Sequence, residues 1–353
     1  MKTLNLCDHI ILDGAYLEIT SFCNSECPYC YNNSGSKGSH LEFEWIQAVL
    51  DEVCKENTAP NFVLSGGEPT LHPDFAKVLE HLSRKNISAR VITNGSRLWE
   101  SEIAESILPH EIQITVESTS ESLHNSIRGK NNFFQLKKAV AILKERDYHN
   151  IIMRVNLSKR NDKEINNFIQ LALDWGCKEI YFAFLQLSGR AEMDSEVISF
   201  QNNQSLAESI ICEIDQSMIE FSEFPISIQN KCKPKRSCIL AKDGKTIFRP
   251  KITPDGSVYP CEAFYSHEFL LGNIKQQSIR QIMESSALAE LIQRLERRTE
   301  EELNCGACSW KSVCGRGCPA SAFDWYHTLE SNSGECSYFK KKYLKKLLQS
   351  NRK

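Results

Sequence analysis

The chain has 353 residues, of which 42 are Lys or Arg and 45 are Asp or Glu, so its formal net charge is -3. This balance argues against nucleic acid as a partner, because nothing in the whole-protein charge attracts a polyanion. No apolar run reaches the roughly 18 residues that a membrane span needs, and the first residues lack a secretory pattern. We therefore expect a globular protein with no membrane segment and a cytoplasmic location.

Six strand-like apolar runs alternate with amphipathic helical runs in the first half of the chain. The expected strands are Tyr16–Thr20, Phe62–Ser65, Ala89–Thr93, Ile112–Val116, Ile151–Val155 and Glu179–Phe184. Apolar residues at helical spacing predict helices around 46–53, 75–82, 136–143 and 165–172, with a weaker pattern at 103–107. Gly176 stands where a left-handed residue would end the last of these helices. Strands and helices in this order predict a parallel sheet with right-handed crossovers, either an open barrel or a doubly wound sheet.

The pattern changes after residue 190, first to a polar connector and then to a Cys-rich segment with few periodic elements. We expect an N-terminal extension at 1–14, an α/β domain at 15–190 and a helical connector at 191–230. A metal-organised domain is expected at 231–340, followed by a basic tail at 341–353.

Fifteen cysteines are more than a reducing cytosol would pair as disulfides, so metal binding is the first hypothesis. Cys23, Cys27 and Cys30 form a C-x3-C-x2-C triad just after the first expected strand. Three thiolates on one loop suit a 4Fe-4S cubane with one iron left open, whereas a structural zinc site needs a fourth ligand that is not nearby. An open iron invites a chelating cofactor.

The triad, with Tyr29 before its last cysteine, resembles the cluster motif of the radical S-adenosylmethionine enzymes, whose common fold is a (β/α)6 partial TIM barrel. The resemblance assigns Gly66, Gly67, Glu68 and Pro69 to the segment that holds the methionine amino group. It assigns Thr93 and Asn94 to the ribose, Thr115 and Arg128 to the methionine carboxylate, and Leu187 to the adenine side. The sequence Thr115-Val116-Glu117-Ser118 departs from the family's usual S-[LIM]-D-G.

The C-terminal cysteines resemble the SPASM domain that is appended to peptide-modifying radical enzymes. By this resemblance a first auxiliary 4Fe-4S cluster is held by Cys232, Cys238, Cys261 and Cys318, and a second by Cys305, Cys308, Cys314 and Cys336. A zinc ribbon would use such C-x2-C spacings equally well. Cys54 and Cys177 are expected at core or boundary positions, while Cys7 and Cys212 have no assigned place.

The two resemblances imply an enzyme with three 4Fe-4S clusters that cleaves S-adenosylmethionine to a 5'-deoxyadenosyl radical, which abstracts a hydrogen from a peptide or protein. They also imply a low-potential electron donor of the flavodoxin or ferredoxin type. About 14 residues precede the first strand, so a leader-binding domain would have to be a separate protein, or absent. Glu262, directly after Cys261, is the candidate catalytic base; the alternative is that it only hydrogen-bonds the backbone around the cluster.

Two alternatives stay open at this stage. The first is an anaerobic sulfatase-maturating enzyme, a family that commonly has Asp where this chain has Glu262. The second is a zinc or iron-sulfur scaffold without chemistry, which would be expected to lose part of the triad or of the segment Gly66 to Pro69. Neither the modified residue nor the type of modification, whether thioether, carbon-carbon link, epimer or oxidised residue, follows from the sequence.

Overall fold

The computed structural model describes residues 10–185, 187–199, 202–228, 246–297, 307–310, 317–332, 336, 338–341 and 344. The chain divides into two compact units. The first consists of Ala15–Gln229 with Lys251–Ser257, and the second consists of Met1–Gly14, Asn230–Pro250 and Val258–Lys353. We call them the sheet unit and the Cys-rich unit.

The sheet unit is built on one curved sheet whose strands follow the order β10-β2-β3-β4-β5-β6-β7-β8. The pairs β10 with β2 and β3 to β8 in sequence are parallel. The strands are β2 (Gly14–Thr20), β3 (Asn61–Gly66), β4 (Ala89–Thr93), β5 (Glu111–Thr115), β6 (Ile151–Leu157), β7 (Glu179–Phe184), β8 (Ile226–Ile228) and β10 (Lys251–Ile252).

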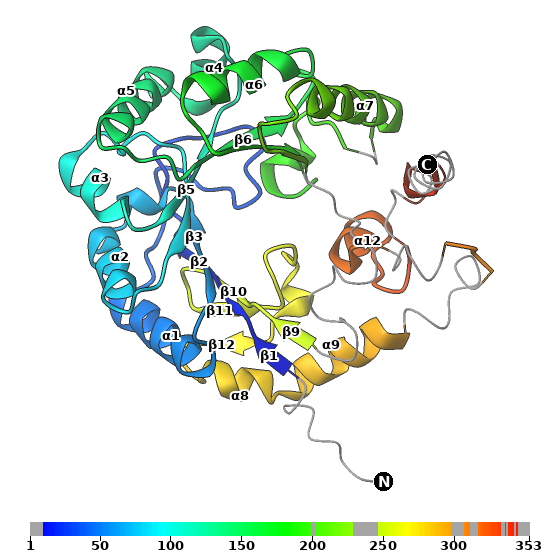
Figure 1. The fold of residues 1–353 in the computed structure, drawn as a ribbon. Coiled ribbons are helices and arrows are strands. Elements are labelled where there is room, and N and C mark those ends of the chain that lie inside the picture. The colour runs from blue at the N-terminus through cyan, green and yellow to red at the C-terminus, as the bar shows by residue number, and fades with distance from the viewer. Residues whose placement is uncertain are drawn as a thin grey trace. The chain divides into compact units, whose positions relative to one another are not determined.

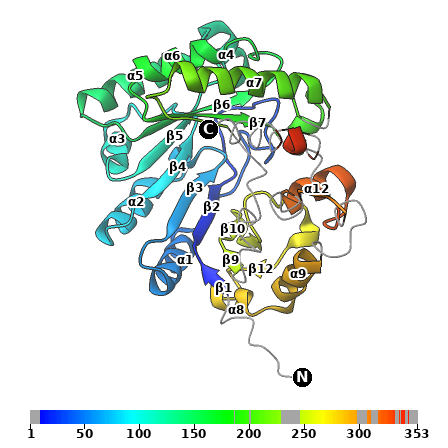
Figure 2. The ribbon, with the colours of Figure 1, turned by 45° about the vertical axis from the view of Figure 1, so that its right-hand side comes forward.

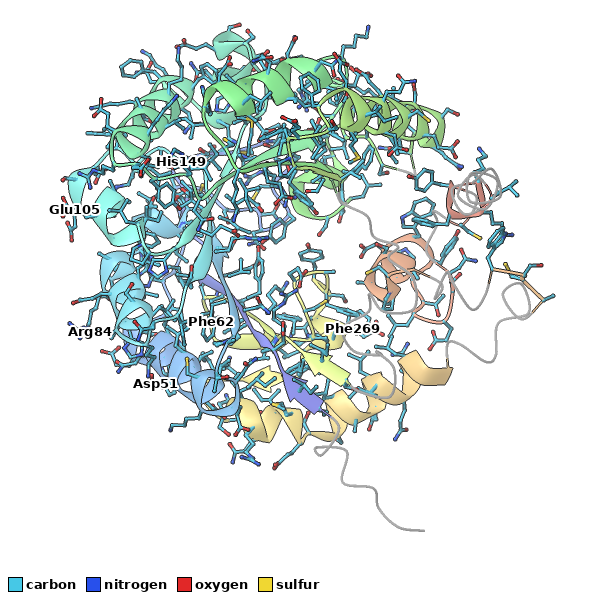
Figure 3. The ribbon with its side chains drawn as sticks, viewed as in Figure 1. Asp51, Phe62, Arg84, Glu105, His149 and Phe269 are labelled. Carbon is cyan, nitrogen blue, oxygen red and sulfur yellow. The ribbon has the colours of Figure 1, made fainter. Side chains whose placement is uncertain are left out.

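Helices cover the outer, convex side of this sheet (Figures 1 and 2). They are α1 (Phe43–Glu56), α2 (Phe75–Arg84), α3 (Ser101–Ile107), α4 (Glu121–Arg128), α5 (Asn132–Glu145), α6 (Ile165–Asp174) and α7 (Gln204–Glu220), with short 3-10 turns η2 (Pro69–Leu71) and η3 (Gly189–Glu192). Their apolar faces are buried, whereas Asp51, Arg84 and Glu105 lie on the outer surfaces of α1, α2 and α3 (Figure 3).

The strand register separates an apolar face from a polar one. Leu64, Val91 and Ile112 share one face through paired positions, and all three are fully buried. The opposite face carries Gln113 and Thr115 on β5, then Arg154 on β6 in register with Thr115. Since an α/β sheet buries its apolar face under helices, the polar face is the one left for a ligand.

The predicted α/β partial barrel followed by a smaller Cys-rich domain is confirmed. Each expected strand and helix is present, and Gly176 has a φ of 68° after α6. Helix α4 and strand β8 were not predicted. Both are short, and β8 has only three residues, so neither shows enough of a period to be recognised.

The Cys-rich unit contains the parallel pair β1 (Ile10–Leu12) and β9 (Thr246–Phe248), together with β11 (Ser257–Tyr259) and β12 (Gly272–Asn273). Its helices are α8 (Ile279–Met283), α9 (Ser286–Arg297) and α12 (Pro319–Tyr326), and a 3-10 turn η4 (His267–Phe269) lies between them. Phe269 stacks edge-on with Phe264 at 4.6 Å and with Phe323 of α12 at 4.7 Å between ring centroids. In the described residues, none of the helices has the length and apolar character needed to cross a bilayer.

Candidate functional site

The expected cofactor residues follow the carboxyl ends of successive strands of the sheet unit. The cysteine loop follows β2, Gly67 to Pro69 follow β3, Asn94 follows β4, and Leu187 follows β7. In parallel α/β sheets this edge is where ligands bind, because the loops there converge while the strands fix their starting points.

The cysteine loop is closed by its own backbone. The Cys23 amide donates to the Gly35 carbonyl at 2.8 Å, and the Cys30 amide donates to the Cys27 carbonyl at 3.2 Å. Cys23 and Cys27 are buried, Cys30 is half-buried, and all three are free thiols. The Ser25 amide points at the Cys23 sulfur at 3.4 Å, which is the kind of hydrogen bond that stabilises a cluster thiolate.

Cys23, Cys27 and Cys30 lie on one loop, which is the arrangement that a 4Fe-4S cubane with one open iron would need. Among the described residues, no three His, Cys, Asp or Glu side chains converge closely enough to hold one metal ion. Burial, together with the nearby Glu68 carboxylate, raises the pKa of the Cys23 thiol to about 12. Metal binding must therefore release protons from this loop.

Two glycines let the loop after β3 approach the cysteine loop. A Cβ on Gly66 would lie 2.1 Å from the Thr20 carbonyl oxygen, and a Cβ on Gly67 would lie 2.2 Å from the Phe22 carbonyl oxygen. The Gly67 amide donates to Thr20, and the Glu68 amide donates to Phe22. Larger residues would separate the two loops, so the glycines are required for the close packing beside Cys23.

Glu68 is fully buried and connects the loops after β3 and β4. Its Oε1 accepts hydrogen bonds from Thr70 and from the Thr93 hydroxyl, and its Oε2 accepts one from the Asn94 amide at 2.7 Å. Burial raises the pKa of this carboxyl against the opposing effect of these bonds. The structure thus gives Glu68 a role in shaping the site besides the ligand contact expected from the sequence. Pro69 is buried at the start of η2.

Asn94 extends these contacts to the cysteine loop. Its Nδ2 donates to the Asn24 side chain at 2.8 Å, and the Asn24 Nδ2 donates to Ser96 at 2.9 Å. The Ser25 hydroxyl donates to the Arg128 carbonyl at the end of α4 at 2.7 Å. The loop that carries the thiols is therefore attached to the ends of β4 and α4.

Arg128 and Tyr29 lie together, but the Arg128 side chain already has an anionic partner. Its Nε and Nη2 donate to Glu117 Oε1 at 2.9 and 2.5 Å; Glu117 is buried, and the Arg128 side chain is 11% exposed. The guanidinium also lies 6.0 Å from the Tyr29 ring centroid. Glu117 is the residue at which the sequence departs from the family motif, and its ion pair with Arg128 was not predicted.

Arg154 is a further candidate that the sequence reasoning missed. It is in register with Thr115 on the polar face, and its Nε donates to Asn156 Oδ1 at 2.9 Å. Within the described part of the chain Arg154 has no carboxylate partner within 4 Å. A single charged residue in the otherwise apolar expected strand 151–155 was the signal that could have identified it.

Leu187 belongs to an apolar cluster around the cysteine loop. The cluster joins Cys27 and Tyr29 to Ile127 of α4 and to Ala191 and Val197 of the loop after β7, with Cys30, Leu123, Leu185 and Leu187 packed against it. This shell limits water around the thiols.

Half of the expected SPASM ligands lie in described residues. Cys261 follows β11, Cys318 is the N-cap of α12, and Cys308 and Cys336 are half-buried. The aromatic stack of Phe264, Phe269 and Phe323 joins the segment after Cys261 to the helix that begins after Cys318. The remaining expected ligands, Cys232, Cys238, Cys305 and Cys314, lie outside the described residues.

Glu262 is exposed in this structure, whereas the base role expected of it needs a desolvated carboxyl. Of the unassigned cysteines, Cys177 is buried and Cys54 is half-buried, as predicted for core and boundary positions. Cys212 is exposed on α7, and Cys7 lies outside the described residues.

Comparison with known proteins identifies two families in the chain. The radical SAM superfamily model matches residues 17–172, and the model of the SPASM iron-sulfur cluster-binding domain matches residues 249–309. The chain is similar to the antilisterial bacteriocin subtilosin biosynthesis protein AlbA of Bacillus subtilis, with 27% identity over 95% of this chain and 73% of AlbA. It is also similar to the AdoMet-dependent heme synthase of Methanosarcina barkeri, with 26% identity over 87% of this chain and 90% of that protein. The mycofactocin maturase MftC of Mycolicibacterium smegmatis is 24% identical over 90% of this chain and 81% of its own length.

Solved structures share the fold. The anSMEcpe structure with bound AdoMet and Cp18Cys peptide has a TM-score of 0.69 and 19% identity, and the match covers 92% of this chain and 94% of that one. Streptococcus suis SuiB bound to precursor peptide SuiA has a TM-score of 0.70 and 14% identity, over 92% and 75% of the two chains. The cofactors implied by the two domains are S-adenosylmethionine and 4Fe-4S clusters. The chain belongs to the radical SAM superfamily of enzymes and to its SPASM-domain subfamily.

Proposed function

We propose that this enzyme modifies a residue of a peptide by radical chemistry, as a maturase of a ribosomally made peptide. The observation that carries the proposal is the junction of loops around Cys23, Cys27 and Cys30, where the ends of β2, β3, β4 and α4 are tied together by hydrogen bonds. Such a junction brings a cluster and a chelating cofactor to one place.

The proposed roles come from the sequence resemblance, and the convergence of these residues at one edge of the sheet supports them. Cys23, Cys27 and Cys30 would hold one cluster, Gly66 to Pro69 would receive the methionine amino group, and Thr93 with Asn94 would receive the ribose. Thr115, with Arg128 or Arg154, would bind the methionine carboxylate, because a guanidinium fork suits a carboxylate. When bound, the reduced cluster and S-adenosylmethionine supply a 5'-deoxyadenosyl radical that removes a hydrogen from the substrate.

A peptide substrate is supported by two of the relatives. AlbA is named for the biosynthesis of a bacteriocin, and MftC is named a maturase. The heme synthase is a relative of comparable identity with a different named product, so a tetrapyrrole is the principal competing substrate class. Sulfatase maturation is a second peptide-directed candidate, because Glu262 after Cys261 keeps the carboxylate of the Asp that is common at this position in that family.

The Cys-rich unit would supply the electron path. Cys232, Cys238, Cys261 and Cys318 would hold one auxiliary cluster, and Cys305, Cys308, Cys314 and Cys336 the other. Removing a hydrogen atom leaves a substrate radical that must lose an electron to form an oxidised or cross-linked product. A low-potential donor of the flavodoxin or ferredoxin type would reduce the cluster on Cys23, Cys27 and Cys30. A separate leader-binding protein would present the peptide. Glu262 would accept a proton only where bound substrate desolvates it.

Replacing one cysteine of the triad tests the assignment. Cys30→Ala should abolish 5'-deoxyadenosine formation, because two thiolates cannot hold a cubane and also present an open iron. Reductant and S-adenosylmethionine are added to the reconstituted protein, and 5'-deoxyadenosine is measured by liquid chromatography. Cys212→Ala is the matched control and should behave as the unmodified chain, since Cys212 is exposed on α7. Wild-type amounts of 5'-deoxyadenosine from Cys30→Ala would contradict the proposal.

A further inference from the structure

The loop after β7 contacts the cysteine loop through Arg190. The Arg190 Nε donates to the Cys27 carbonyl at 2.8 Å, and its Nη2 donates to the Ser34 carbonyl at 2.9 Å. The Arg190 amide donates to the Cys30 carbonyl at 3.0 Å. One residue thus bonds to both ends of the turn between Cys27 and Cys30 and to the segment after it.

The neighbouring glycine makes this contact possible. Gly189 has a φ of 58°, and a Cβ there would lie 2.4 Å from the Tyr31 carbonyl oxygen and 2.7 Å from the Cys30 carbonyl oxygen. Any side chain at this position would move the loop away from the thiols. The close approach therefore brings the backbone of Arg190 within hydrogen-bond distance of Cys30.

The far end of the same loop is fixed independently. Arg160 makes a two-point ion pair with Asp194 at 2.9 and 2.7 Å, and the Lys159 amide donates to the Glu196 carbonyl at 2.9 Å. Asp194 has a side chain that is only 4% exposed, so this pair is partly shielded from solvent. The loop 188–197 is consequently a rigid support rather than a free segment.

We propose that Arg190 is a positioning residue that fixes the Cys27 to Cys30 turn before a cluster is present. A guanidinium can bridge two carbonyls because its donors form a planar fork, whereas a lysine ammonium is a single point charge. The contacts are made to backbone carbonyls, so they set the direction of the cysteine side chains without touching the sulfur atoms. The importance of the turn for catalysis rests on the proposed role of the triad, but its positioning by Arg190 does not.

Hydrogen exchange of the full-length apo protein tests directly whether Arg190 fixes the turn between Cys27 and Cys30. The reporters are the amides of Cys23, Cys30 and Asn33, which are hydrogen-bonded within the loop. In Arg190→Gln, exchange in residues 23–35 should be at least about ten-fold faster, because two hydrogen bonds from a charged donor are lost. Arg190→Lys should lie between Arg190→Gln and the unmodified chain. Arg84→Gln, on the outer surface of α2, is the matched control and should leave this segment unchanged (Figure 3).

A second measurement uses the reconstituted enzyme. Iron release to a chelator should be about ten-fold faster in Arg190→Gln for the portion bound by the triad, and unchanged for the remaining iron. Unaltered exchange in residues 23–35 would overturn the proposal, and so would an equal acceleration in every segment of the protein. Failure of Cys30→Ala to abolish 5'-deoxyadenosine would instead count against the proposed function and would leave the exchange result standing.

Discussion

Arg128 and Arg154 are alternative partners for one carboxylate, and the structure gives them different surroundings. The Arg128 side chain is 11% exposed and lies against the buried Glu117, so its charge is already compensated. Arg154 is half-buried on the polar face in register with Thr115, its Nε donates to the neutral Asn156, and its guanidinium lies 5.6 Å from the Tyr181 ring centroid. The motif resemblance favours Arg128, whereas the charge balance in the structure favours Arg154.

Cofactor analogues can separate these two arginines. We expect Arg154→Gln to weaken S-adenosylmethionine binding about ten-fold, since a charge-assisted bond to the carboxylate is lost. Its affinity for decarboxylated S-adenosylmethionine should be unchanged, because that analogue lacks the group concerned. Equilibrium dialysis with both compounds measures the difference. If Arg128→Gln shows this pattern and Arg154→Gln does not, the carboxylate belongs to Arg128.

The sequence could propose which residues surround the cysteines, because a motif fixes the chemistry of its positions. It could not predict the hydrogen bonds between loops. Asn24 pairs with Asn94 and Arg190 with Cys27 across long stretches of chain, Glu117 pairs with Arg128 eleven residues later, and each pairing depends on how the loops meet.

At the scale of helices and strands, His110 ties α2 to the start of β4. The Ala89 amide donates to its Nδ1 at 3.2 Å, and its Nε2 lies 3.2 Å from the Leu79 carbonyl oxygen. The ring is fully buried, and burial lowers the pKa of His110 to about 4 from an ordinary value of 6.5. Protonation of Nδ1 would break the bond from Ala89, so the neutral ring is part of the folded state.

This depressed pKa predicts a loss of stability in acid. Well above pH 6.5 the imidazole is neutral in both the folded and the unfolded state, and its contribution to stability is fully present. As the pH falls from about 7.5 towards 4, His110 becomes protonated in the unfolded chain but stays neutral in the folded chain. The free energy of unfolding therefore decreases. Between pH 7.5 and 5.5 this amounts to about 1 kcal/mol.

Urea unfolding of the apo protein at the two pH values measures the effect. His110→Gln should have a correspondingly shallower pH dependence, because glutamine does not titrate. His149→Gln, at an exposed histidine, is the control for the loss of one imidazole elsewhere in the chain (Figure 3). Equal pH dependence in His110→Gln and the unmodified chain would show that His110 titrates normally.

Most elements of the sheet unit could be predicted because they have a clear period. Strands β3 to β7 and their helices alternate regularly, so the apolar positions that pack together are visible in the sequence. Strand β8 has three residues, and α4 has only two buried side chains, so tertiary packing rather than pattern places them. In the Cys-rich unit the strands have two or three residues, and cysteine spacing was the only usable signal.

At the scale of the whole molecule, the metal content shows whether the Cys-rich unit holds two auxiliary 4Fe-4S clusters or a zinc ribbon. Three cubanes predict about 12 iron and 12 sulfide per chain after anaerobic reconstitution, whereas a zinc ribbon predicts about 4 iron together with zinc.

Cys318 is the N-cap of α12, and Phe323 of this helix packs on the aromatic stack that begins after Cys261. A defect at Cys318 should therefore stay within the Cys-rich unit. Cys318→Ala should therefore lose about 4 iron and still form 5'-deoxyadenosine, because the triad lies in the sheet unit. Metal analysis and cofactor cleavage on the same sample are sufficient. If the chain instead binds about two zinc atoms, and Cys318→Ala leaves the iron content unchanged, then the C-terminal cysteines hold structural zinc and not auxiliary clusters.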